Sequence, residues 1–215
     1  MSRIVLVVRE PAQALAWRNV LLAGCHEVVA VTNAARSARG LLTQHQPQLV
    51  LCELRLSDGT ALAMIQWLAA LPQRPLIVAV ADNDDDPLMV EALRAGADNV
   101  CVRAAHAEAL LTLIDQTLRG ETALSTALAH ALLDHFERAR IPRHHALLSI
   151  GDEQSPLQLE PVQRDLLMRL AAGYRTDQVA AACRLSVGEL GRRLRAIVRK
   201  LQWDVRAGSL TLQLA

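Results

Sequence analysis

A run of basic side chains near the end of the chain has the composition of a polyanion-binding surface. The segment 185–201 reads LSVGELGRRLRAIVRKL, and the spacing of Ser186 and Glu189 is that of a capping box, which predicts a helix start. At a helical period one stripe is apolar: Val187, Leu190, Leu194, Ile197, Val198 and Leu201. The opposite arc carries the cations Arg192, Arg193, Arg195, Arg199 and Lys200. Because Glu189 is the single opposing charge, this arc favours nucleic-acid binding over a merely solvated face.

Two further clusters contain side chains of the types that bind metals. The loop at 82–86 reads DNDDD, but it lacks the alternating spacing and the glycine of a calcium loop. A solvated loop that caps the next helix is therefore the favoured interpretation, with a hard-cation site as the alternative. His144 and His145 have no partner at ligand spacing, which favours exposure to solvent. We expect no bound metal and no cofactor.

The sequence contains no GxSxG, GxGxxG, P-loop or HExxH motif, so nothing in it indicates an enzyme. Its four cysteines are scattered without a CxxC pair, which argues against a zinc site or a disulfide framework. They are Cys25, Cys52, Cys101 and Cys183. We expect all four to be small buried hydrophobic residues.

Composition and charge point to a globular protein with a basic C-terminal module. Hydrophobic residues make up 52% of the 215 residues, which is ample for buried cores. No apolar run approaches the roughly 20 residues of a membrane helix, and no cleavage site follows the N-terminus, so a cytoplasmic location is expected. Residues 1–120 and 121–155 each carry a net charge of −2, whereas 156–215 carry +5. This split predicts a nucleic-acid-binding module attached to another domain.

An alternation of short apolar runs and amphipathic segments must position these side chains. The expected strands are 3–8, 26–32, 48–54, 75–81 and 99–103. The expected helices are 12–24, 34–45, 60–71, 86–96 (with Asp86 as its N-cap) and 107–120. This order predicts an α/β doubly wound parallel five-stranded sheet. A helical segment at 121–141 and a turn-rich linker at 142–156 follow.

Two stretches of sequence carry a family resemblance. PQLVLCELRLSDG (47–59) and EALRAGADNVCVRAAHAEALLTLI (91–114) resemble the third-strand segment and the last helix–strand–helix of bacterial receiver domains. The segment 159–201 is similar to the LuxR-type helix-turn-helix domain of the NarL/FixJ response regulators. The residues at the expected spacing there are Gly173, Ala180, Leu185, Ser186, Gly188, Arg199, Lys200 and Leu201.

The resemblance implies a division of the chain into three parts. Residues 1–120 would form a receiver-like, flavodoxin-like domain, and 121–155 a linker helix followed by a flexible linker. Residues 156–215 would form an all-α helix-turn-helix domain that binds DNA. Its first helix is expected at 161–172, a scaffold helix at 177–184, the recognition helix from Val187, and a separate last helix near 206–214.

The positions that carry phosphoryl transfer in receivers are altered here. The resemblance places Arg9 and Glu10 at the acidic pair and Glu53 at the phosphoaccepting aspartate. It places Val80 at the hydroxyl position, Val100 at the aromatic position and Arg103 at the lysine position. These substitutions predict a pseudo-receiver that binds Mg²⁺ poorly and is not phosphorylated. We hypothesise that Arg9 and Arg103 both pair with the Glu53 carboxylate in place of metal and phosphate; the alternative is drifted residues without a shared role.

The resemblance also assigns roles within the basic helix. Candidates for base edges are Gly188, Glu189, Arg192 and Arg193, beside Ser186 at the helix start. Candidates for phosphate contacts are Arg195, Arg199 and Lys200. Thr176 is expected to cap the scaffold helix and add a backbone contact. Glu189 and Gly191 depart from the family pattern. Glu189 places an acid against the polyanion, and Gly191 lacks the basic side chain that is usual there. The DNA sequence preference of the family therefore cannot be transferred to this chain.

Taken together, these features predict a bacterial transcriptional regulator that binds double-stranded DNA as a homodimer on a pseudo-palindromic site. Its receiver would act independently of phosphorylation, and a regulatory protein could bind there. The alternative is a protein-interaction adaptor whose altered helix-turn-helix no longer reads DNA specifically. Sequence-selective, salt-dependent binding would distinguish the first from the second.

Overall fold

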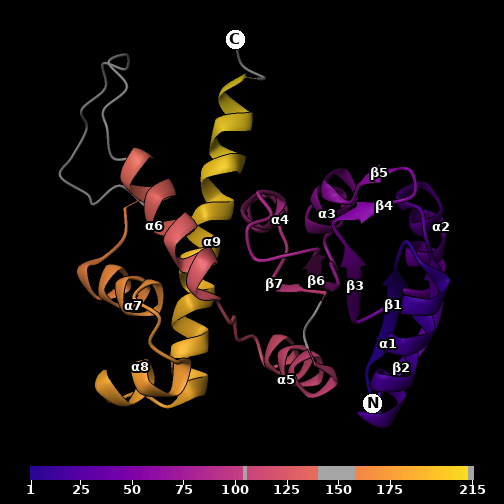
Figure 1. Ribbon diagram of the computed structural model, residues 1–215. Coiled ribbons are helices and arrows are strands. Elements are labelled where there is room, and N and C mark those ends of the chain that lie inside the picture. Colours follow the sequence, from indigo (N-terminus) through magenta and orange to yellow (C-terminus); the bar gives the residue numbers. More distant parts are fainter. Residues whose placement is uncertain (104–105, 140–157, 213–215) are drawn as a thin grey trace.

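A five-stranded parallel sheet forms the centre of the N-terminal half. The computed structural model describes residues 1–103, 106–139 and 158–212, without the side chains of residues 139 and 203–212. The strands are β1 (Arg3–Val7), β2 (Glu27–Thr32), β3 (Leu49–Glu53), β6 (Leu76–Ala81) and β7 (Asn99–Val102). Their order is β2-β1-β3-β6-β7, with all neighbours parallel (Figure 1). The predicted doubly wound sheet is confirmed.

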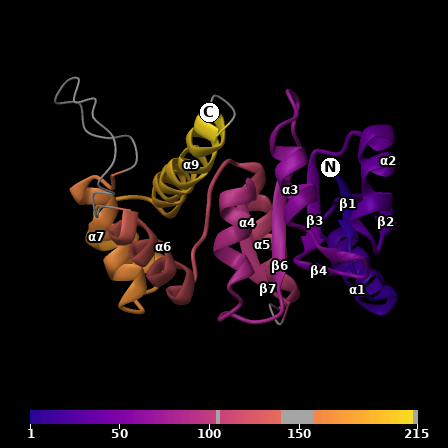
Figure 2. The same ribbon diagram turned by 90° about the horizontal axis from the view of Figure 1, so that it is seen from above.

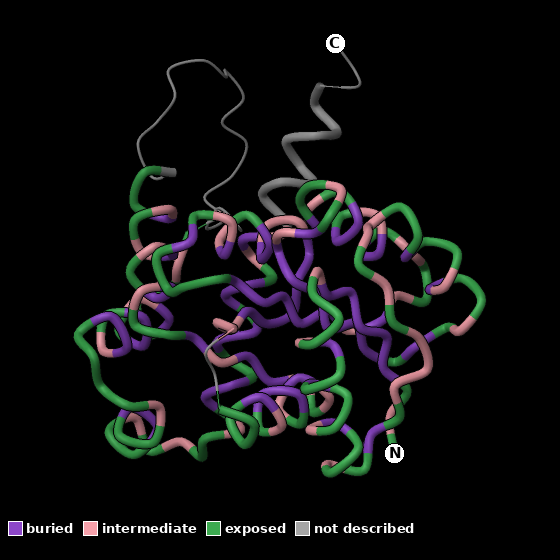
Figure 3. The backbone as a smooth tube through the Cα atoms, turned by 45° about the vertical axis from the view of Figure 1, so that its right-hand side comes forward, coloured by how far each residue is buried: buried purple, intermediate pink, exposed green. Residues whose placement is uncertain are grey.

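Five helices cover the two faces of this sheet. They are α1 (Pro11–Ala23), α2 (Ala35–His45), α3 (Leu62–Ala69), α4 (Leu88–Ala95) and α5 (Ala107–Leu118). Side chains alternate along each strand, so Ile4 and Leu6 pack with α1 and α5, whereas Val5 and Val7 pack with α2, α3 and α4. Figure 3 draws the backbone as a tube, and its buried segments lie in the middle of the molecule. Each predicted strand and helix of this half is present, with ends shifted by at most two residues.

Two local features of this half differ from expectation. A hairpin of β4 (Arg55–Leu56) and β5 (Gly59–Thr60) was not predicted, because two residues per strand are too few to show a period. Cys52 is buried as expected, but Cys25 is exposed in the turn after α1, where its φ is +60°. The prediction that all four cysteines are buried is therefore wrong.

Four helices make up the described part of the C-terminal half. They are α6 (Thr126–Ala139), α7 (Pro161–Ala171), α8 (Thr176–Ala182) and α9 (Val187–Leu212). A four-residue turn joins α8 to α9, and within it Arg184 has a φ of +56°, which gives the pair the connection of a helix-turn-helix. The predicted separate last helix is wrong, because α9 continues to Leu212 without a break. The predicted linker at 142–156 lies outside the described residues.

The apolar stripe of α9 joins the two halves into one core. Leu190, Leu194, Ile197 and Leu201 are fully buried, and their cluster extends without interruption to α3 and α4. Val187, the first residue of α9, was predicted to share this stripe but is 42% exposed. Helices α9 and α4 lie side by side in both views (Figures 1 and 2). Among the described residues no helix is long and apolar enough to cross a membrane.

Asp58 stabilises the start of α2 from a distant loop. Its carboxylate accepts the backbone N–H groups of Ala35 (2.9 Å) and Arg36 (3.1 Å), and these bonds lower the pKa of Asp58. Asp58→Ala is expected to reduce the free energy of unfolding by about 1 kcal/mol in urea denaturation at pH 7. Because the folded pKa is the lower one, this contribution is present above the unfolded value of about 3.9 and is lost as pH falls through the folded pKa. Equal stability of both proteins at pH 7 would contradict it.

Candidate receiver site and nucleic-acid interface

Glu53 ends β3 at the carboxyl edge of the sheet, where the resemblance placed a phosphoaccepting aspartate. It is only 1% exposed and lies beside Val80 of β6, its partner in the strand register. Arg103 follows β7, and its Nη2 atom lies 3.2 Å from Glu53 Oε1. The parallel strands bring these three residues together because their carboxyl ends meet at one edge. The predicted ion pair between Glu53 and Arg103 is thus present.

Arg9 contributes to this site through its backbone rather than its side chain. Its backbone N–H donates to Glu53 Oε2 at 2.7 Å, while its guanidinium lies 3.4 Å from the carboxylate of Glu10. The prediction that the Arg9 guanidinium reaches Glu53 is therefore wrong. Arg9 lies two residues beyond the end of β1, and its backbone N–H is directed towards the end of the neighbouring strand β3.

The acidic loop completes a network of charges around Arg103. Asp82 Oδ1 lies 2.6 Å from Arg103 Nη2, and Asp86 pairs with Arg55 through both carboxylate oxygens. Burial opposes ionisation of Asp86, but the hydrogen bond from Arg55 lowers its pKa overall. Asp86 Oδ1 also accepts the Leu88 N–H at 3.0 Å, so it binds a donor in the first turn of α4. Pro87 rather than Asp86 is the N-cap residue, which corrects the predicted cap. No group of three potential metal ligands occurs among the described residues.

Sequence patterns did not identify Arg55 or Asp82 as members of this network. Arg55 lies in the unpredicted hairpin, and Asp82 is one of several similar acids in its loop. Nearby thiols offer no nucleophile at neutral pH, because burial raises the pKa of both Cys52 and Cys101 to about 12. Val80 and Val100 supply neither hydroxyl nor aromatic ring. The site holds an ion pair between Glu53 and Arg103.

The capping box at the start of α9 is formed as predicted. The Ser186 N–H donates to Glu189 Oε2 at 2.8 Å, and the Glu189 N–H donates to Ser186 Oγ at 3.2 Å. Bonds from the Ser186 backbone and hydroxyl lower the pKa of Glu189. The carboxylate is therefore occupied by its own helix end, which accounts for an acid at the start of a basic helix.

Two glycines on α9 lie directly against the α/β half. A Cβ at Gly188 would lie 2.9 Å from Glu121 Oε1, and one at Gly191 would lie 2.8 Å from Glu121 Cβ. The Thr122 N–H donates to the Gly191 carbonyl oxygen at 3.0 Å. A side chain at 191 would prevent this approach, so packing accounts for the unexpected glycine. Gly188, a candidate for a base edge, is partly buried beside Glu121 in this structure.

Arg195 is buried against the α/β half rather than exposed on the basic arc. Its Nη2 atom lies 2.7 Å from Asp98 Oδ1, and the two residues are 9% and 3% exposed. Asp98 also binds Arg74 (2.7 Å) and accepts the Ile77 N–H (2.9 Å). Burial lowers the pKa of Arg195, with Asp98 acting in the opposite direction. The prediction of an exposed phosphate-binding Arg195 is wrong for this arrangement, and the sequence carried no signal for Asp98.

The remaining candidates divide into exposed and engaged side chains. Arg193 and Arg199 are exposed, and Arg192 is exposed with its Nη1 atom 3.9 Å from Glu121. Lys200 instead binds Gln163 (2.9 Å) and Glu160 (3.1 Å) of the α7 start, so it ties α9 to α7 rather than facing outward. Thr176 is the first residue of α8 and Arg175 is its N-cap, which corrects the predicted capping role of Thr176.

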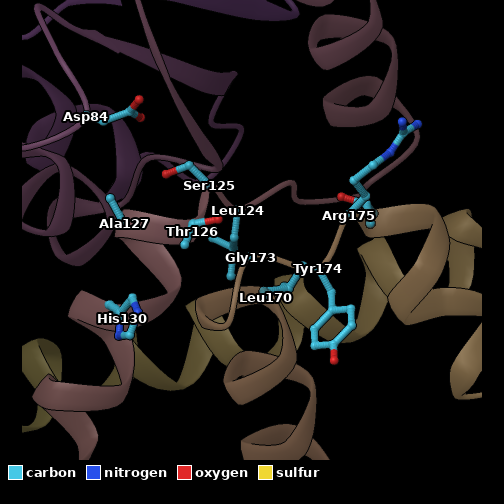
Figure 4. Close-up of a pocket in the computed structure, with 11 residues that line it drawn as sticks. Asp84, Leu124, Ser125, Thr126, Ala127, His130, Leu170, Gly173, Tyr174 and Arg175 are labelled. Carbon is cyan, nitrogen blue, oxygen red and sulfur yellow. The ribbon is translucent and has the colours of Figure 1, made fainter.

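An open pocket of about 600 Å³ lies between the start of α6 and the turn from α7 to α8. Asp84, Ser125 and His130 line one side and Tyr174 and Arg175 the other (Figure 4). The Tyr174 and Arg175 side chains point in opposite directions, so the polar groups do not converge on a common point. This pocket offers no built binding site.

Comparison with known proteins identifies the family of the chain. The family model for the response regulator receiver domain matches residues 4–115. The transcriptional regulatory protein YdfI of Bacillus subtilis is 23% identical over 96% of this chain and 90% of its own. The nitrate/nitrite response regulator NarL of Escherichia coli K12 is 24% identical over 86% of this chain and 83% of its own.

Solved structures of response regulators have the same fold as this chain. RcsB of Salmonella typhimurium aligns with a TM-score of 0.55 at 13% identity, over 93% of this chain and 91% of its own. A solved RcsB–DNA complex also aligns with a TM-score of 0.55 at 13% identity, over 94% of this chain and 92% of that chain. Because the receiver match spans more than half of the chain, this protein belongs to the response regulator receiver domain family.

Proposed function

We propose that this protein is a DNA-binding transcriptional regulator whose receiver domain is not controlled by conventional aspartyl phosphorylation. The observation that carries the DNA-binding part is the exposed basic arc of α9 directly after the α8–α9 turn, with Arg192, Arg193 and Arg199 on it. Helices in this position enter the major groove in helix-turn-helix proteins. The names of NarL and YdfI and the RcsB–DNA complex support the same function.

Within this proposal the exposed arginines have separate roles. Arg192 and Arg193 lie near the helix start and contact base edges, whereas Arg199 lies two turns later and contacts phosphate. A homodimer in the cytoplasm on a pseudo-palindromic site fits this mode of binding. Residues 1–120 would then form the receiver, 121–155 the linker and 156–215 the DNA-binding domain.

The receiver part of the proposal rests on the charges around Glu53. A guanidinium lies 3.2 Å from Glu53 and 2.6 Å from Asp82, in the space where a divalent cation would bind between acidic oxygens. These residues do not fit Mg²⁺, because Arg103 already supplies the positive charge and brings no metal-binding atom. Activation therefore comes from a regulatory protein at the receiver or from dimerisation.

Incubation with acetyl phosphate and Mg²⁺ tests the receiver part. We expect intact mass spectrometry to show no phosphoryl adduct on Glu53. With beryllofluoride in place of acetyl phosphate, we expect the mass spectrum of the protein to stay unchanged. A stoichiometric adduct would overturn phosphate-independent control while leaving the DNA-binding part intact.

The closed arrangement of the two halves adds a condition for DNA binding. Gly188 lies against Glu121, Gly191 against Thr122 and Arg195 against Asp98, so the first turns of α9 face the receiver. A major groove cannot reach this side of α9 until the contact opens. DNA binding is then coupled to the separation of α9 from the receiver.

A mobility-shift assay with genomic binding sites tests the DNA-binding part. Changing both Arg192 and Arg193 to alanine is expected to abolish sequence-specific binding, because each bidentate base contact contributes about 1–3 kcal/mol of discrimination. Arg3→Ala with Arg18→Ala removes equal charge from exposed receiver positions and should leave specific binding unchanged. Undiminished binding by the α9 variant would refute this placement. Binding without sequence preference, together with a stable protein complex, would favour the adaptor function instead.

A further inference from the structure

A second cavity lies at the opposite edge of the sheet from Glu53. It has a volume of about 640 Å³ and is bounded by the ends of α2 and α3 and by the loop that precedes β6. Its walls are mainly apolar, with Leu42, Trp67, Leu68 and Leu71 on the helices and prolines at 47, 72 and 75 in the loops. This volume and composition match those of small-molecule sites, and the prolines make the walls rigid.

Arg74 is the single charged residue among those that line this cavity. Its guanidinium is held in place, since Nη1 donates to the Gly96 carbonyl oxygen (3.1 Å) and both Nη atoms donate to Asp98. An arginine has five N–H donors, and those left on Nε and Nη2 bind no described residue. A positioned, half-buried cation with spare donors recognises one anionic oxygen group.

Trp67 forms a flat apolar wall, and Arg39 places a second positive charge near it. The Arg39 guanidinium lies over the Trp67 ring, 5.3 Å from its centroid. No acidic residue lines the cavity, and Asp98 behind Arg74 is already bonded to two guanidinium groups and a backbone N–H. The cavity therefore combines apolar walls with a positive end.

We propose that this cavity, the α2–α3 cavity, binds a small amphipathic anion, with its apolar body against Trp67 and Leu71 and a single carboxylate on Arg74. A nucleotide or polyphosphate does not fit, because only one lining residue is a cation and the walls are apolar.

Occupancy of the cavity has a consequence for α9. Arg74 and Arg195 share Asp98, and the charge of Arg74 acts against the protonated form of Arg195. A ligand carboxylate on Arg74 offsets this repulsion and strengthens the Asp98–Arg195 contact. Ligand binding thus favours the closed arrangement and weakens DNA binding; this consequence rests on the proposed function, whereas ligand binding itself does not.

Titration of the full chain with 2-naphthoate, a fused aromatic ring system with one carboxylate, tests the site. The indole N–H signal of Trp67, assigned with Trp67→Phe, is followed by NMR. We expect saturable binding, and we expect the neutral analogue 2-naphthalenemethanol to bind about tenfold more weakly, equivalent to about 1.4 kcal/mol. Absence of saturation, or equal binding of the neutral analogue, would overturn the proposal.

Variants separate this cavity from other apolar surfaces. Leu71→Glu places a negative charge in the cavity and should weaken 2-naphthoate binding about tenfold or more. Leu22→Glu, at an exposed leucine of α1, makes the same change outside the cavity and should have no effect. Arg74→Lys keeps a cation but removes the second donor edge, and it gives an independent test if Leu71→Glu does not fold. Binding that Leu71→Glu and Arg74→Lys both leave unchanged would show that 2-naphthoate binds elsewhere.

The effect of 2-naphthoate on DNA binding is measured in a separate experiment, the DNA arm. Saturating 2-naphthoate should reduce DNA affinity of the wild-type protein and leave that of Arg74→Lys less affected. Failure of this arm alone overturns the coupling to α9 and not the site, and absence of DNA binding without any ligand overturns the proposed function instead.

Discussion

Arg103→Met is expected to lower the free energy of unfolding by about 3 kcal/mol, because it leaves a buried carboxylate without its cation. Glu53 is 1% exposed, and Arg103 Nη2 lies 3.2 Å from its Oε1 atom. After the change, Glu53 keeps only the Arg9 N–H, and Asp82 loses its 2.6 Å partner. Methionine retains much of the aliphatic volume, so the loss reports charge rather than packing. Denaturation in urea at pH 7, followed by circular dichroism, measures it.

Two further variants make this result specific to the Glu53–Arg103 pair. Arg138→Met breaks an exposed pair with Asp134 and should change stability by about 0.5 kcal/mol or less. Glu53→Gln combined with Arg103→Met removes both charges and should recover at least half of the loss. An Arg103 variant no less stable than the Arg138 variant, or a double variant as unstable as Arg103→Met, would show that the ion pair does not stabilise the receiver.

Arg195→Met is expected to raise DNA affinity about tenfold, since loss of a buried charged hydrogen bond costs the closed arrangement about 1.5–3 kcal/mol. Asp98 stays bonded to Arg74 and the Ile77 N–H, so the receiver should remain folded. Fluorescence anisotropy with labelled double-stranded DNA at fixed salt measures the affinity. A basic residue is removed, yet binding improves, which distinguishes this outcome from loss of a phosphate contact.

Arg199→Met is the matched control on the same helix. Arg199 is exposed one turn beyond Arg195, and its loss should weaken binding at all sequences and reduce the salt slope by about one. If Arg195→Met weakens binding in the same way as Arg199→Met, Arg195 contacts phosphate and its bond to Asp98 does not limit access to DNA.

Periodicity and family resemblance predicted most elements and part of the receiver site. Strands buried on both faces are nearly continuous apolar runs, so β1, β3 and β6 were evident, and parallel order then brought Glu53 and Arg103 to one edge. The hairpin at 55–60 was missed because its strands have two residues each. The Arg9 contact was assigned to the wrong group, because residue type does not reveal that a backbone N–H is the donor.

The helix at 187 shows where the sequence alone determined this protein and where it did not. The capping box and the apolar spacing determined its start and its buried stripe, because both are local patterns of one helix. Periodicity also placed Arg195 among the basic side chains, but only the tertiary structure decided that Asp98 binds it from 97 residues away. The same holds for Gly191, because only the tertiary structure brings Thr122 against its backbone. Local spacing determines which face a residue occupies; which surface meets that face depends on how the two halves pack.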